Sequence, residues 1–78
     1  MKVQNSSDPN VIKKVTFERT LFSGRKIEQS VEAYISPFEG EGPGINVESV
    51  NLQLEDIPEF IKAVELAAMI ASGELEIE

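Results

Sequence analysis

The stretch DIPEFIKAVELAAMIAS, residues 56–72, decides the fold because it carries a complete helix signal. Asp56 and Glu59 have the spacing of an N-terminal capping box, in which a short carboxylate faces the free amides of the first turn and Glu59 reaches back. Pro58 lies in that first turn, where a missing N–H costs nothing, and Gly73 follows at the position of a C-terminal cap. We therefore predict an α-helix over this stretch.

The predicted helix has more apolar surface than one face can use. At about 100° per residue, the usual core-facing stripe is formed by Ile57, Phe60, Ile61, Val64, Ala67, Ala68 and Ala71. The opposite side carries Leu66, Met69 and Ile70, with Ala63 beside them. Because a second apolar face needs a partner, we predict a homodimer with Leu66, Met69 and Ile70 at its interface.

Length and composition describe one small globular domain. The chain has 78 residues, of which 41% are hydrophobic and 27% are charged, and at this size one core is marginal and oligomerisation is a common remedy. No apolar run approaches the roughly 20 residues of a membrane span, and the N-terminus lacks the apolar core of a signal peptide. We expect a cytoplasmic protein without a membrane partner.

Residue usage argues against catalysis and against metal or cofactor binding. The chain has no His and no Cys, so the commonest general base and the thiolate ligands are missing, and Ser or Thr has no imidazole to activate it. Glu39, Glu41 and Glu48 lack the ligand spacing of a calcium loop, and the glycine-rich segment 39–44 contains no Lys to hold phosphate. We predict neither an enzyme nor a cofactor.

Charge is divided unevenly along the chain. The net charge is −7, which argues against nucleic acid, yet residues 1–30 carry a net +3 and residues 31–78 a net −10. A basic and an acidic end can coexist on one domain, and a ligand meets the local field. Chance segregation of solvated charges explains the same distribution.

Ahead of the helix, the sequence has the period of β-strands. Residues 1–10 are polar and are predicted to be a flexible tail. From Val11 the residues alternate, with Val15, Phe17 and Leu21 on the parity of Val11. A turn signal at 23–24 separates this strand from a second alternating run, in which Ile27, Val31, Ala33 and Ile35 share one parity. The two runs predict an antiparallel hairpin.

Residues 37–44 hold two prolines and three glycines and are predicted to be a loop. Residues 45–54 follow as a third strand that changes parity near 48–49, so it is either bulged or divided into two short strands. Residues 74–78 alternate but are acidic, and they are predicted to be a frayed acidic tail, with an added strand as the alternative. The fold class is therefore α+β: a two-layer domain over residues 11–73, with a three- to four-stranded curved antiparallel sheet followed by one C-terminal helix.

This order of parts resembles the transcriptional coactivator family of single-stranded-DNA-binding domains. The resemblance covers about residues 11–72. It lies in the basic turn Ser23-Gly24-Arg25-Lys26, the second strand ending at Tyr34, the Gly/Pro loop at 40–44, the segment Val50-Asn51-Leu52 and the acidic-capped helix with Phe60. Two departures remove positive charge: 45–49 contains no basic residue, and Glu32 and Ala33 precede Tyr34 where the family has an Arg.

The resemblance implies a homodimer that binds single-stranded DNA or RNA and acts in transcription regulation. Such binding needs aromatic rings for stacking and cations along the backbone. The residues predicted to provide them are Lys13, Lys14, Arg19, Phe22, Arg25, Lys26 and Tyr34. The acidic C-terminal half supports an alternative: a small protein-interaction module that uses its exposed sheet or an edge strand and has no nucleic-acid or catalytic role.

Overall fold

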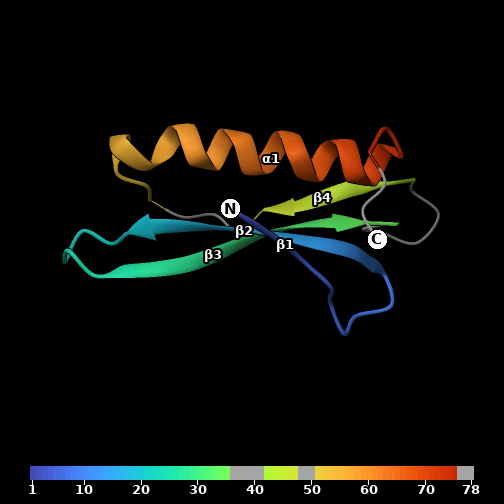
Figure 1. The fold of residues 1–78 in the computed structure, drawn as a ribbon, viewed down its shortest axis with the longest axis horizontal. Helices are drawn as coiled ribbons and strands as arrows, with labels where there is room; N and C mark the ends of the chain where they lie inside the picture. The colour runs from blue at the N-terminus through green and yellow to red at the C-terminus, as the bar shows by residue number, and fades with distance from the viewer. Residues whose placement is uncertain (36–41, 48–50, 76–78) are drawn as a thin grey trace.

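The computed structural model describes residues 1–35, 42–47 and 51–75. Its elements are β1 (Lys2–Gln4), β2 (Val11–Thr20), β3 (Lys26–Tyr34), β4 (Gly44–Val47), the 3-10 turn η1 (Leu54–Asp56) and α1 (Ile57–Ser72). The four strands form one antiparallel sheet in the order β1-β2-β3-β4, and α1 lies across one face of it (Figure 1). The predicted fold class, an antiparallel sheet followed by a C-terminal helix, is confirmed. In the described part of the chain, no helix has the length and hydrophobicity to cross a membrane.

The β2–β3 hairpin forms as the alternation predicts. Val15 pairs with Val31 and Thr16 with Ser30, so one parity faces α1 and the other faces away. The Gly24 N–H donates to the Leu21 carbonyl and the Leu21 N–H to the Arg25 carbonyl, each at 2.8 Å. Gly24 has a φ of 93°, which closes a three-residue loop and favours glycine.

A bulge at the start of β2 changes which residue reaches the core. Val11 pairs with Tyr34, but Lys13 pairs with Ala33, so Ile12 is the extra residue. Ile12 packs against the core, while Val11 is buried outside that cluster. The expectation that Val11 and Val15 face the same side of the sheet is therefore wrong, because the bulge lies between them.

Small residues line the face of the helix that packs on the sheet. Ala63 and Ala67 are fully buried against Val15, Val31 and Ala33. At the hairpin end of the helix, Phe17 and Phe60 meet edge to face with ring centroids 5.8 Å apart. Alanine lets the helix axis approach the sheet closely, so few large side chains are needed to fill the layer.

The helix is rotated relative to the predicted core stripe. Ile70, predicted at a dimer interface, is only 4% exposed and belongs to this chain's own core. Leu66 packs against the same core, and only Met69 of the three is exposed. Conversely, Ile61 is 47% exposed and Ala68 is also exposed. The homodimer stays a prediction, but Ile70 cannot serve it without leaving the core.

The predicted capping box does not form. The Asp56 side chain makes no cap hydrogen bond with α1; instead its Oδ2 accepts the Thr20 N–H at 3.0 Å, and Asp56 is buried. Glu59 pairs with Lys62 at 3.6 Å. The other two signals are confirmed, since Pro58 lies in the first turn and Gly73 ends the helix with a φ of 83°.

Two expectations about the chain outside the hairpin also change. Residues 1–10 are predicted to be a flexible tail, but in the structure Lys2–Gln4 forms β1, and Val3 packs on the core. A strand of three residues is too short to show a recognisable alternation of apolar and polar residues. The strand predicted over residues 45–54 corresponds to β4, which ends at Val47, and Leu54 begins η1. The predicted parity change at 48–49 and most of the predicted loop lie outside the described residues, as does 76–78 of the acidic tail.

Candidate functional site

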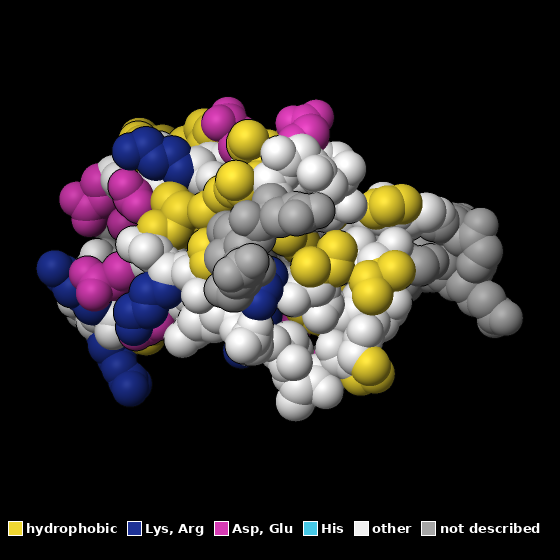
Figure 2. Space-filling model, turned by 45° about the vertical axis from the view of Figure 1, so that its right-hand side comes forward, with side chains coloured by type: hydrophobic (Ala, Val, Ile, Leu, Met, Phe, Trp, Pro, Cys, Tyr) yellow, Lys and Arg dark blue, Asp and Glu magenta, His cyan; other side chains and the backbone are white. Residues whose placement is uncertain are grey.

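The face of the sheet that points away from α1 carries charges of both signs. It holds Lys2, Lys14 and Lys26 together with Glu18, Glu28 and Glu32. Lys2 pairs with Glu28 at 3.2 Å and Lys26 with Glu18 at 3.7 Å. Between them the Thr16 hydroxyl bonds to the side chains of Gln4 and Ser30. Figure 2 views the sheet from its side, and there Lys and Arg side chains lie among Asp and Glu side chains at the left of the view, toward the hairpin end of the molecule. This face offers no continuous track of cations.

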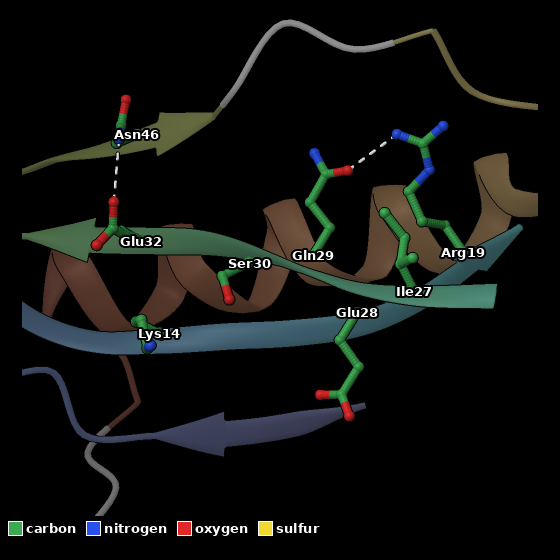
Figure 3. Close-up of a pocket in the computed structure, with 8 residues that line it drawn as sticks. All are labelled: Lys14, Arg19, Ile27, Glu28, Gln29, Ser30, Glu32 and Asn46. Carbon is green, nitrogen blue, oxygen red and sulfur yellow. Dashed lines mark hydrogen bonds between the residues drawn. The ribbon is translucent and has the colours of Figure 1, made fainter. Parts of the chain in front are cut away.

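Arg19, predicted to contact nucleic acid, is a structural residue. It is 5% exposed and lies on the parity of the core. Its Nη1 donates to Gln29 Oε1 at 3.0 Å and its Nη2 to the Asn51 carbonyl at 2.7 Å, while its Nε has no partner among the described residues. Figure 3 shows Arg19 and Gln29 turned toward each other. The alternation of β2 by itself predicts a core-facing residue at position 19. A positive charge usually indicates a surface position, although the long apolar stem of an arginine can be buried.

Lys13 and Tyr34 lie far from the hairpin turn. Lys13 Nζ donates to Asn5 Oδ1 near the bulge. Tyr34 ends β3, about 26 Å from Lys26 at roughly 3.3 Å per residue. Desolvation raises the pKa of Tyr34 above 10.0, helped by the Glu32 and Asp8 carboxylates. Within one copy of the chain, the predicted binding residues therefore do not lie together on one surface.

Three of the predicted residues do come together at the hairpin turn. Phe22 is 71% exposed, and Arg25 and Lys26 are exposed beside it. The sequence did not identify a fourth residue at this end of the molecule, Leu54, which is 89% exposed. Gln53, next to it, donates from Nε2 to the carbonyls of Thr20 and Leu21 at 3.1 and 2.8 Å. We call Phe22, Arg25, Lys26 and Leu54 the hairpin-end surface.

A groove lies at the other end of the molecule, between the start of β4 and the C-terminal half of α1. Its volume is about 400 Å³, and it is lined by Pro43, Gly44, Ile45, Ala68, Ala71 and Ser72. Ser72 alone contributes a polar side chain. We call these six residues the β4–α1 groove. The sequence signal for it was the pair of small residues Ala68 and Ala71 at helical spacing, which leaves room beside the strand.

A second hollow, of about 440 Å³, lies along β3 and is polar (Figure 3). Lys14, Arg19, Glu28 and Glu32 contribute two charges of each sign to its lining. Glu28 points toward β1, and Glu32 points to Asn46, whose Nδ2 donates to Glu32 Oε1 at 3.0 Å. Within the described residues no cluster of carboxylates could hold a metal ion.

Comparison of the chain with protein-family models, with curated proteins and with solved structures yields no match. Evidence about function therefore comes from the surfaces described above, and the resemblance to the coactivator family stays a prediction.

Proposed function

We propose that this chain is a protein-interaction module that takes up an extended segment of a basic partner along β4 and the β4–α1 groove. The observation that carries the proposal is an edge strand beside an apolar groove. β4 pairs with β3 on one side, and no strand of the described residues pairs with its other side. An unpaired strand edge presents N–H and C=O groups to which an extended peptide can add as a further strand.

Apolar side chains next to this edge supply the contact surface. Ile45 and Val47 point to the helix side of the sheet, since they pair with Ala33 and Val31. Ala68 and Ala71 of α1 line the groove with Ile45. By helical periodicity, the flank of the helix that carries Ala68 also carries Val64, which is half-buried, and Ile61, which is exposed. Alternate side chains of an added strand would face this apolar strip, and such contacts give strand addition its specificity.

Charge favours a basic partner. The net charge of −7 attracts cations, and the last turn of α1, beside the groove, contains no basic residue to offset the negative end of the helix dipole. Electrostatic complementarity of this kind raises the association rate and suppresses acidic partners.

Fluorescence anisotropy of a short labelled peptide with alternating lysine and valine tests the proposal, with a glutamate–valine peptide as its matched counterpart. We expect the lysine peptide to bind and the glutamate peptide not to bind. Ala68→Lys should abolish binding, because it puts a cation into the groove. Met69→Lys adds the same charge one position along the helix, outside the groove, and should leave most of the binding intact. Equal loss in both variants, or no binding to the wild-type chain, would refute the proposal.

Nucleic-acid binding stays a prediction, and two observations count against proposing it. Arg19 is buried, and Lys26 is paired with a carboxylate. Because phosphate binding depends on free cations, a labelled single-stranded oligonucleotide should bind more weakly than the lysine–valine peptide at the same low salt. Tighter binding of the oligonucleotide, lost on charge reversal at Arg25 and Lys26, would support the prediction instead.

A further inference from the structure

The hairpin-end surface has the composition of an anchor. Phe22 and Leu54 are the two most exposed large hydrophobic residues in the described part of the chain, at 71% and 89%. Arg25 is exposed beside them and has no ion pair within the described residues. Aromatic and arginine side chains dominate the binding energy of protein interfaces.

Partly buried hydrogen bonds hold this surface in one shape. The segment 51–56 is tied to β2 and its turn by Arg19 Nη2 to the Asn51 carbonyl, by Gln53 Nε2 to two hairpin carbonyls, and by the Thr20 N–H to Asp56 Oδ2. Leu54 is therefore fixed at the same end as the Phe22 turn. A preorganised surface loses less conformational entropy on binding.

The opposite end of the same molecule complements it. The long axis measures 39 Å, with the hairpin turn at one end and the start of β4 and the end of α1 at the other (Figure 1). There the β4–α1 groove is apolar and about 400 Å³ in volume, large enough for an aromatic side chain. Glu74 is exposed two residues after the groove's Ser72. One end of the molecule therefore has an apolar hollow with a negative charge nearby, and the other end has an apolar anchor with a positive charge.

We propose that the hairpin end of one copy of this chain docks into the β4–α1 groove of another copy. Phe22 enters the groove, and Arg25 lies against Glu74 and the carboxyl end of α1. This inference rests on the proposed function, because it uses the same groove; the segment that docks is the hairpin turn of a second copy, which lies in the part of the chain, residues 1–30, that carries a net +3. The two surfaces lie at opposite ends, so the contact is head-to-tail and adds copies in a row instead of closing a two-fold dimer.

Sedimentation equilibrium of the full chain tests the inference. The wild-type mass should rise with concentration above the 8.6 kDa of the monomer and should continue past the dimer. Phe22→Asp removes the anchor and Ala68→Lys blocks the groove, so each should weaken association by at least about tenfold, as truncating an anchoring residue does. Both positions are exposed, and circular dichroism should show both variants folded.

Mixing the two variants gives the sharper result. The Phe22→Asp chain keeps its groove and the Ala68→Lys chain keeps its hairpin, so the mixture should form a dimer and nothing larger. Met69→Lys should associate as the wild type does. A wild-type chain that is monomeric at all concentrations, a mixture that stays monomeric, or association abolished by Met69→Lys would overturn the inference. Phe22→Asp should still bind the lysine–valine peptide; if the wild-type chain is monomeric but binds that peptide through the groove, this inference fails and the proposed function stands.

Discussion

Replacing Asp56 by Ala separates the observed role of this carboxylate from the capping role that its sequence position predicts. In the structure the carboxylate is buried and accepts the Thr20 N–H at 3.0 Å, so it joins the start of the helix to the end of β2. A hydrogen bond to a charged group is worth about 1.5–3 kcal/mol, and negative charge at a helix N-terminus adds about 0.3–1 kcal/mol. Together these predict a loss of about 2–4 kcal/mol from the free energy of unfolding.

Urea denaturation followed by circular dichroism measures this loss, and Glu59→Ala is the matched control. Glu59 makes only an exposed pair with Lys62, so its removal should cost less than about 0.5 kcal/mol. Hydrogen exchange adds a local readout, because Asp56→Ala should deprotect the Thr20 amide specifically. A loss below about 1 kcal/mol for Asp56→Ala, or similar losses for both variants, would contradict the stabilising role of the bond between Asp56 and Thr20 and would favour the capping box instead.

Three further predictions concern the core and the sheet. Arg19→Ala should destabilise the fold by about 2–3 kcal/mol, since it removes the hydrogen bonds to Gln29 and Asn51, whereas Arg25→Ala at the exposed turn should stay within about 0.5 kcal/mol; urea midpoints compare them, and equal effects would contradict the burial of Arg19. Ala67→Leu should cost about 1–3 kcal/mol by overpacking the layer between helix and sheet, while Ala68→Leu on the exposed flank should be tolerated; thermal melts that rank them the other way would show the helix to be rotated. Glu32→Gln should lower the pKa of Tyr34 toward 10.0 by removing a carboxylate that favours the neutral phenol, as read from phenolate absorbance. Because the folded pKa is raised, this tyrosine's contribution to stability is complete below pH 10.0 and is lost as the pH rises through the folded pKa.

The hairpin and the helix could be predicted because their signals are local. Alternation from Val11, the Ser23-Gly24 turn and the 3.6-residue period after Pro58 each depend on neighbouring residues alone, and all three elements form. β1 could not be predicted, since three residues carry too little pattern and their strand is stabilised by pairing with β2.

The orientation of the helix could not be predicted because it depends on side-chain size as well as polarity. The predicted stripe counted Ile61 as core and assigned Ile70 to a partner, yet the helix packs through Ala63 and Ala67, which bring it close to the sheet and carry Ile70 inward. For the same reason, Ile61 and Ala68 became exposed beside β4. The helix does leave apolar side chains exposed, but they include Ile61 and Ala68 from the predicted core stripe, and of the predicted second face only Met69 is exposed.

The hairpin-end surface could be predicted in part, whereas none of the predicted site residues lines the β4–α1 groove. The turn signal predicts Phe22, Arg25 and Lys26, which are exposed together at the hairpin turn. The charge of Arg19 predicts a surface position, but its place in the alternation is that of a core residue, and it is buried. The sequence pattern predicts Leu54 to lie in a strand, whereas in the structure a 3-10 turn held by Gln53 and Asp56 presents it to solvent. These contacts join residues more than thirty positions apart, beyond the reach of a local pattern.

Heteronuclear NMR of the labelled chain during titration with the lysine–valine peptide tests most directly whether a basic peptide binds along β4 and the β4–α1 groove. Binding at this site predicts shifts of the backbone amide signals of Gly44–Val47 and of α1 residues 68–72, with those of Thr16 and Ser30 on the opposite sheet face unchanged. Shifts concentrated on Thr16 and Ser30, or none at all, would contradict it.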